Sequence, residues 1–314
     1  MNEAAAAGVE IRAEVVSDLQ NIMMPEGISR VALEASGLLY LPDIGRFVVV
    51  SDETERKQPD LYLMDTAGYI GNKTTVKKCK LINDMEGITA DPQGRIYLLS
   101  SQSYSRKGKL KPERKLLVRC TRQGTELRAE ASVSLIDLME TAARTAAKSA
   151  WAEFILRGVR THTTDIEGVV WHDGHLLLGF KNPRIGHDAV ILSIADPDAM
   201  FTGKKLSAEQ IRIRYRFPVV DTATGTFCGI SDLCFVEDQL FGLSTGVQSS
   251  SGVATDIGLF WMYHPETGTL QVLRRFSGCK PEGIACNNGN GLFYIVFDNG
   301  SKNASQFMTA KVSP

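Results

Sequence analysis

The sequence predicts an all-β protein, a single five-bladed β-propeller domain that takes in residues 1–314. Three observations predict it: a segment that recurs five times along the chain, the four short strands expected around each copy, and an N-terminal strand that can complete the last copy. Repeats of roughly 50 residues that each hold four strands are typical of propeller blades. Six blades is the alternative, and it would need a hidden repeat between Glu86 and Glu167.

Each copy of the repeat combines a small turn motif, an apolar strand, a Gly- or Asp-containing turn and a second strand that ends in polar residues. The copies begin at Glu34, Asp84, Asp165, Gly229 and Lys280. The second copy reads DMEGITADPQGRIYLLSSQ and the third reads DIEGVVWHDGHLLLGFKN. A third strand candidate follows every copy, and a fourth follows the first four, so that each copy accounts for one blade.

The fifth copy ends with the strand FMTAKV from Phe307, so its fourth strand must come from elsewhere in the chain. The stretch from Val9 to Val16 alternates apolar and polar residues, as a half-buried strand does. We expect it to complete the last blade. Closure of this kind removes an exposed sheet edge that would otherwise invite aggregation.

A helical insertion over 134–158 is expected between the second and third blades. It reads SLIDLMETAARTAAKSAWAEFILRG, rich in Ala, Leu, Met and Glu, with no Gly or Pro before Gly158. Ser134 with Asp137 three residues later resembles a capping box, and Gly158 suits a helix end. We expect one helix of about 20 residues against a rim of the propeller. It either covers apolar surface or recruits a protein partner.

Composition and charge argue against nucleic acid and membrane as partners. The chain has 35 Lys and Arg against 36 Asp and Glu, a net charge of -1 that gives no long-range attraction for either. No apolar run approaches the ~20 residues that span a bilayer. Met1–Glu10 has neither the basic segment nor the apolar core of a signal peptide. We therefore expect a cytoplasmic protein, or a secreted one if a leader was removed.

One residue of each repeat falls at the same point, where the innermost strand begins. These residues, called here the central ring, are Ser36, Glu86, Glu167, Ser231 and Glu282. Further acids flank them at Glu34, Asp84, Asp165 and Asp232. Equivalent positions of the innermost strands converge on the channel of a propeller. Carboxylates gathered there repel one another, and a hard, oxygen-ligated cation such as calcium relieves the repulsion. In the alternative, Glu-Gly and Ser-Gly are turn dipeptides bonded to nearby backbone amides.

The order Ser, Glu, Glu, Ser, Glu resembles the central calcium site of the calcium-activated nucleotidases, the soluble apyrases with a five-bladed propeller. EASGLLYLPDIGRFVVVSDE is similar to their first blade and KPEGIA to their last. The D-x-E-G pattern also resembles bacterial propellers described as esterase-like or phytase-like. The resemblance implies that the five ring residues hold calcium. It also implies an Asp-Arg pair and a later arginine, in whose places Asp52 and Arg184 stand, although the extra acids Glu53 and Glu55 would repel a diphosphate.

Two functions from different classes follow. The first is a calcium-dependent hydrolase of a phosphate ester or anhydride, with the ring as metal ligands, Asp52 as base and Arg184 as phosphate contact. A basic run over 106–115 would attract a small anionic ligand to this enzyme. The alternative is a non-enzymatic binding scaffold, in which calcium only pins the blades and the helical insertion recruits a partner.

Overall fold

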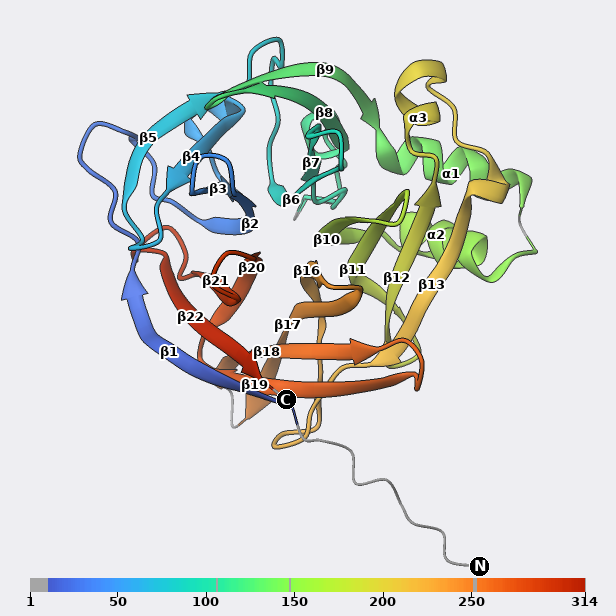
Figure 1. Ribbon diagram of the computed structural model, residues 1–314. Coiled ribbons are helices and arrows are strands. Elements are labelled where there is room, and N and C mark those ends of the chain that lie inside the picture. Colours follow the sequence, from blue (N-terminus) through green and yellow to red (C-terminus); the bar gives the residue numbers. More distant parts are fainter. Residues whose placement is uncertain (1–10, 106, 147, 251–252, 314) are drawn as a thin grey trace, which may run out of the picture.

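Five four-stranded antiparallel sheets surround a central axis, which confirms the five-bladed propeller predicted from the repeats (Figure 1). The computed structural model describes residues 11–105, 107–146, 148–250 and 253–313. In the first four blades the strands follow one another in chain order across the sheet. Within the described ranges there is no sixth four-stranded sheet, only the short pair of β14 (Val220–Asp221) and β15 (Thr226–Phe227).

The blades are named here from the innermost strand outward. Blade one comprises β2 (Ala35–Leu41), β3 (Arg46–Ser51), β4 (Asp60–Met64) and β5 (Ile70–Thr75). Blade two comprises β6 (Met85–Ala90), β7 (Ile96–Ser100), β8 (Leu116–Gln123) and β9 (Glu126–Ser134). Blade three comprises β10 (Asp165–His172), β11 (His175–Ile185), β12 (Asp188–Ala195) and β13 (Ile211–Pro218). Blade four comprises β16 (Gly229–Val236), β17 (Gln239–Ser250), β18 (Val253–His264) and β19 (Thr269–Ser277).

Blade five joins the two ends of the described chain. Its strands are β20 (Lys280–Asn287), β21 (Leu292–Asp298), β22 (Gln306–Ser313) and β1 (Arg12–Asn21). β1 pairs antiparallel with β22, from Arg12 opposite Ser313 to Asn21 opposite Gln306. The strand expected from Val9 thus extends further along the chain, and its first two residues lie outside the described ranges.

Two helices, rather than the single one expected, lie between β9 and β10. They are α1 (Leu135–Thr145) and α2 (Ala150–Thr161), and Ser149, a favourable residue before a helix, starts the second. Their apolar faces belong to the same buried cluster as the outer strands of blades two and three. Phe154 of α2 packs edge-on against Phe180 of β11, with ring centroids 4.9 Å apart. The insertion therefore covers apolar surface of the propeller.

Gly158 lies inside α2 and does not end it, contrary to the expectation from its position in the sequence. A Cβ atom there would lie 2.9 Å from Oγ1 of Thr164 and 3.2 Å from the ring of Pro183, so close packing requires glycine. The helix ends at His162, which adopts a left-handed conformation with φ of 57°.

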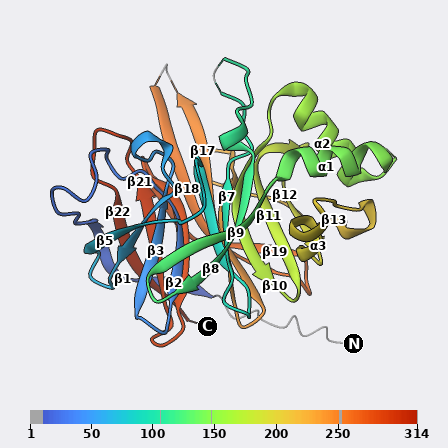
Figure 2. The ribbon, with the colours of Figure 1, turned by 90° about the horizontal axis from the view of Figure 1, so that it is seen from above.

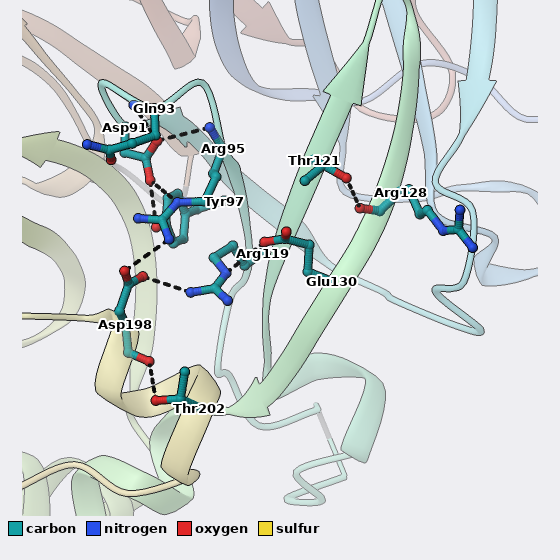
Figure 3. A network of polar contacts seen from close by, with 10 residues as sticks. All are labelled: Asp91, Gln93, Arg95, Tyr97, Arg119, Thr121, Arg128, Glu130, Asp198 and Thr202. Carbon is teal, nitrogen blue, oxygen red and sulfur yellow. Dashed lines mark hydrogen bonds and ion pairs between the residues drawn. The ribbon is translucent and has the colours of Figure 1, made fainter.

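A polar network ties blade two to blade three at the end of the strands farthest from the central ring (Figure 3). The buried carboxylate of Asp91 accepts hydrogen bonds from Arg95 Nε at 2.6 Å and from the Tyr97 hydroxyl at 2.9 Å. Arg95 and Arg119 both contact Asp198, at 2.9 and 2.7 Å. Asp198 opens the short helix α3 (Asp198–Gly203), which follows β12. These contacts fix the angle between the two blades.

Three segments rise above the face where the innermost strands begin (Figure 2). They are the β17–β18 hairpin, the loop after β7 and the α1–α2 insertion. The loop after β7 contains the short 3-10 turn η2 (Pro112–Arg114); similar turns are η1 (Glu55–Lys57) and η3 (Ala208–Gln210). No helix in the described part of the chain is long and apolar enough to cross a membrane.

Candidate functional site

The central ring lies on the five innermost strands, one residue per blade. Ser36 is on β2, Glu86 on β6, Glu167 on β10, Ser231 on β16 and Glu282 on β20. The first four are buried, and the Glu282 side chain is 12% exposed. The ring positions read from the repeats therefore all lie at the start of an innermost strand.

Glycine follows four of the ring residues because neighbouring innermost strands touch there. A Cβ atom on Gly87 would lie 2.7 Å from the backbone oxygen of Glu167, and one on Gly37 would lie 2.9 Å from that of Glu86. Asp232 takes this place in blade four. Its carboxylate accepts hydrogen bonds from the backbone N–H of Leu233 and of Ile284, both at 2.8 Å. The repeated Glu-Gly pattern thus sets the spacing between blades.

The two ring serines make matching contacts between blades. Ser36 Oγ donates a hydrogen bond to the backbone oxygen of Met85, and Ser231 Oγ donates one to that of Pro281 at 2.8 Å. Each acceptor immediately precedes the ring glutamate of the neighbouring blade. The hydroxyl protons are therefore used between blades, while oxygen lone pairs remain for other contacts.

Three carboxylates gather on the side of blades one and two. Asp52, Asp84 and Glu86 each offer an oxygen within 4.8 Å of the others, and this group is called here the acid cluster. Asp52 follows β3 and Asp84 precedes β6, so the ends of two neighbouring strands bring them together. Oδ1 of Asp52 is buried and has no hydrogen-bond partner. A buried carboxylate oxygen without a partner is costly, and it marks the place where a cation or proton would be stabilised.

The loop between β7 and β8 holds Asp84 in place. Arg114 Nη2 contacts Oδ1 of Asp84 at 2.5 Å. The hydroxyls of Ser101 and Ser103 both donate to Oδ2, the latter at 3.1 Å. Arg114 also donates to Ser103 Oγ at 2.9 Å, which closes the network. Four hydrogen-bonding contacts from this loop therefore hold Asp84 and its partners in place.

Lys181 lies on β11 of blade three, beside Glu167, and was missed by the sequence analysis. Its Nζ is 2.7 Å from Oε1 of Glu167 and 3.8 Å from Oε1 of Glu282. Lys181 directly follows Phe180, which pairs with the residue before Glu167, just as Asp52 follows Ser51, which pairs with the residue before Ser36. This equivalence to Asp52 in the repeat is the signal that would have found it.

Burial dominates the electrostatics of the ring. It raises the pKa of Asp52 to about 9, with the neighbouring Asp84 adding to the rise. Burial, followed by Asp52 and Glu167, raises the pKa of Glu86 well above its usual value. Burial also raises the pKa of Glu167 and of Glu282 to about 8, and Lys181 opposes both rises. The carboxylates therefore outnumber the positive charges available to them, and protons or a cation must make up the difference.

The chemistry of the acid cluster fits a hard divalent cation. Its donors are carboxylate oxygens alone, which calcium and magnesium prefer, and no histidine or cysteine belongs to it among the described residues. Oδ1 of Asp52 has no hydrogen-bond partner in the described chain, so this oxygen is available as a ligand of the cation.

Arg184, expected to contact phosphate, makes its described contacts elsewhere. Its Nη1 donates to the backbone oxygen of Phe227 at 2.7 Å, and its own backbone oxygen accepts from Arg157 at 2.6 Å. In the basic run, Arg114 is bound to Asp84, and Lys115 pairs with Asp137 at 2.9 Å. The exposed members are Lys107, Lys109 and Lys111, and Arg106 lies outside the described residues.

The acid cluster lies outside five of the molecule's hollows. Five hollows of about 260 to 650 Å³ occur in the described part of the chain, and Asp52, Asp84 and Glu86 line none of them. One of about 610 Å³ is bordered by Lys280 and Asp298, which act electrostatically on Glu282.

No family model matches the chain, and no curated protein matches it. Many solved structures are similar to it. A GDP-Man-dependent mannosyltransferase from Leishmania mexicana has 10% identity and a TM-score of 0.49, over 94% of this chain and 90% of that one. A gluconolactonase from Xanthomonas campestris has 8% identity and a TM-score of 0.40, over 97% and 98%. The tail fiber of a Staphylococcus aureus phage has 12% identity and a TM-score of 0.42, over 93% of this chain and 52% of that one.

The chain thus spans about half the length of the phage tail fiber that it resembles. Identities this low carry no function from one propeller to another, because propellers host many unrelated activities. The function must be argued from the residues of the site.

Proposed function

We propose that the protein is a hydrolase that depends on a divalent cation and acts on a phosphate ester or anhydride at the mouth of the channel. The observation that carries the proposal is the acid cluster of Asp52, Asp84 and Glu86, with one buried oxygen of Asp52 left without a partner. Calcium is the cation we propose, since all the donors are hard oxygens. When bound, it would polarise phosphoryl oxygens and stabilise the charge that develops on them.

The chain's own residues divide the remaining work in this proposal. Asp84 and Glu86 bind the cation, and Arg114 orients Asp84. Asp52 adds Oδ1 as a third ligand, and its other carboxylate oxygen serves as proton acceptor. Its pKa of about 9 keeps the group protonated at neutral pH until a positive charge nearby lowers that pKa. The exposed lysines of the loop after β7 raise the local concentration of anions over the cluster.

The test is phosphate release by the purified full chain from nucleoside triphosphates, sugar phosphates and phytate, in calcium and in EDTA. We expect calcium-dependent release from at least one substrate class, and a fall of at least about 100-fold in kcat/KM for Asp84→Asn, since a cation ligand is lost. The matched control is Asp198→Asn, a carboxylate on the opposite face, which should keep full activity. Absence of phosphate release from every class would overturn the proposal.

A second candidate is a binding scaffold in which the cation is structural. Two observations favour it: Ser36 and Ser231 are used in hydrogen bonds between blades, and the acid cluster lines none of the five hollows. Replacing Lys107, Lys109 and Lys111 together by Ala separates the two. An enzyme that attracts anions would show a higher KM, by about tenfold, whereas a scaffold has no turnover to change.

A further inference from the structure

Lys181 divides the central ring into two electrostatically different sides. Its ammonium group contacts Glu167 of blade three and Glu282 of blade five, at 2.7 and 3.8 Å. The side chain is only 28% exposed, so water screens these charges weakly. On the other side, the positively charged Arg114 binds Asp84, and no ion pair is found for Glu86 or Asp52 within the described ranges. Within the described ranges, Glu167 and Glu282 thus share one cationic group, whereas Asp52 and Glu86 have no ion pair of their own.

From this arrangement we infer that Lys181 is the built-in counter-ion of the ring and restricts it to one divalent cation, held off the axis by Asp52, Asp84 and Glu86. The inference rests on the cation site of the proposed function and goes beyond it. It states that Glu167 and Glu282 are not ligands, because the ammonium group occupies the position between them where a metal would bind. Repulsion between that ammonium and a second cation keeps the second cation out.

The inference differs from the five-ligand ring read from the sequence in one measurable respect. If all five ring residues bound a cation on the axis, Glu86 and Glu282 would be equivalent ligands. With Lys181 in place the two glutamates are not equivalent, because Glu86 belongs to the acid cluster and Glu282 lies near the lysine ammonium group.

The first experiment measures the calcium affinity of the EDTA-treated full chain by titration calorimetry, with calcium alone as the probe. Glu86→Gln and Glu282→Gln are the matched pair, since both keep the shape of a ring glutamate and remove its charge. We expect the calcium Kd to rise at least about 100-fold for Glu86→Gln and to stay within about threefold for Glu282→Gln. Equal losses in the two variants would overturn the inference and leave the proposed function standing.

The second experiment counts the calcium ions. Lys181→Met should raise the stoichiometry from one ion per chain to two, and Lys181→Arg, which keeps the charge, should leave it at one. A folded Lys181→Met variant that still binds one ion contradicts the inference. If that variant does not fold, the pair of glutamine variants decides. A wild type that binds no calcium would contradict the inference and the proposed cation site together, whereas a wild type that binds one ion with equal losses in the two glutamine variants contradicts the inference alone.

Discussion

The two sides of the central ring are built from the same repeat and differ in how their charge is balanced. Glu167 and Glu282 share a lysine from β11. Asp52 and Glu86, on the side of blades one and two, lie close to Asp84, and one oxygen of Asp52 has no hydrogen-bond partner. The repeat therefore determines where side chains converge. The residues that vary between blades determine which of the converging side chains are available to bind a ligand.

A buried carboxylate elsewhere in the molecule gives the largest expected effect. Asp91 is fully paired, with Arg95, Tyr97 and two backbone N–H groups, in the network of Figure 3. Asp91→Asn removes the charge that these donors need, and we expect the free energy of unfolding to fall by about 3 kcal/mol, as for a broken buried ion pair. Urea unfolding at neutral pH measures it, and the response of the protein to calcium should be unchanged.

Substitution of Gly87 tests the spacing between the innermost strands at the central ring. In Gly87→Ala the added methyl group would meet the backbone oxygen of Glu167, so blades two and three must move apart. We expect a loss of roughly 2 to 3 kcal/mol, the usual result of overpacking. Gly71→Ala is the control, since a Cβ there meets nothing closer than 3.9 Å, and its stability should change by less than about 0.5 kcal/mol. Equal losses would contradict close packing at the ring.

The stability of the metal-free protein should fall as the pH rises from 5 to 9. The pKa of Asp52 is about 9 and those of Glu167 and Glu282 about 8 in the folded chain, above the values near 4 of unfolded carboxyl groups. The folded state thus binds more protons in this range, and its stability is lost as they dissociate. We expect the Tm to drop by on the order of 5 °C across it. A Tm that rises over the same range in EDTA would contradict these shifts.

The smallest effect has the opposite sign and sharpens the comparison with Asp91. Asp52→Asn removes a buried carboxyl group that ionises only at high pH, so at pH 9 the metal-free protein should gain about 1 kcal/mol in unfolding free energy. The same variant should lose its stabilisation by calcium. Thermal melts in EDTA and in calcium measure both effects. Destabilisation in EDTA would show that Asp52 is paired in solution.

Much of the fold could be predicted because its signals are local. Each blade repeats an apolar pattern that begins with a ring Glu or Ser, followed by Gly in four blades and by Asp232 in blade four, so the ring positions could be read without tertiary information. The break between α1 and α2 could also have been predicted, since Ser149 is a favourable residue to precede a second helix. The role of Gly158 could not have been predicted, because it depends on Thr164 and Pro183, which pack against it only in the folded chain.

The candidate site could be predicted in part. The charges of the ring were read from its glutamates, but the polar residues that end the second strands were not compared with one another. Lys181, at the end of a second strand, was therefore left out, although it is equivalent to Asp52. Arg184 shows a different limit, since its pattern of Pro followed by Arg is local while its contact with Phe227 comes from the β14–β15 pair, which follows blade three in the chain.

The central claim is that the acid cluster binds a divalent cation, and a thermal melt of the EDTA-treated full chain across a calcium titration tests it most directly. Magnesium and the Glu86→Gln variant serve as controls. A ligand that binds only the folded state adds about 2.7 kcal/mol at a hundredfold excess over its Kd, so the Tm should rise steadily with calcium in the wild type and stay constant in Glu86→Gln. A Tm that does not respond to calcium, or that rises equally in both proteins, would contradict the claim.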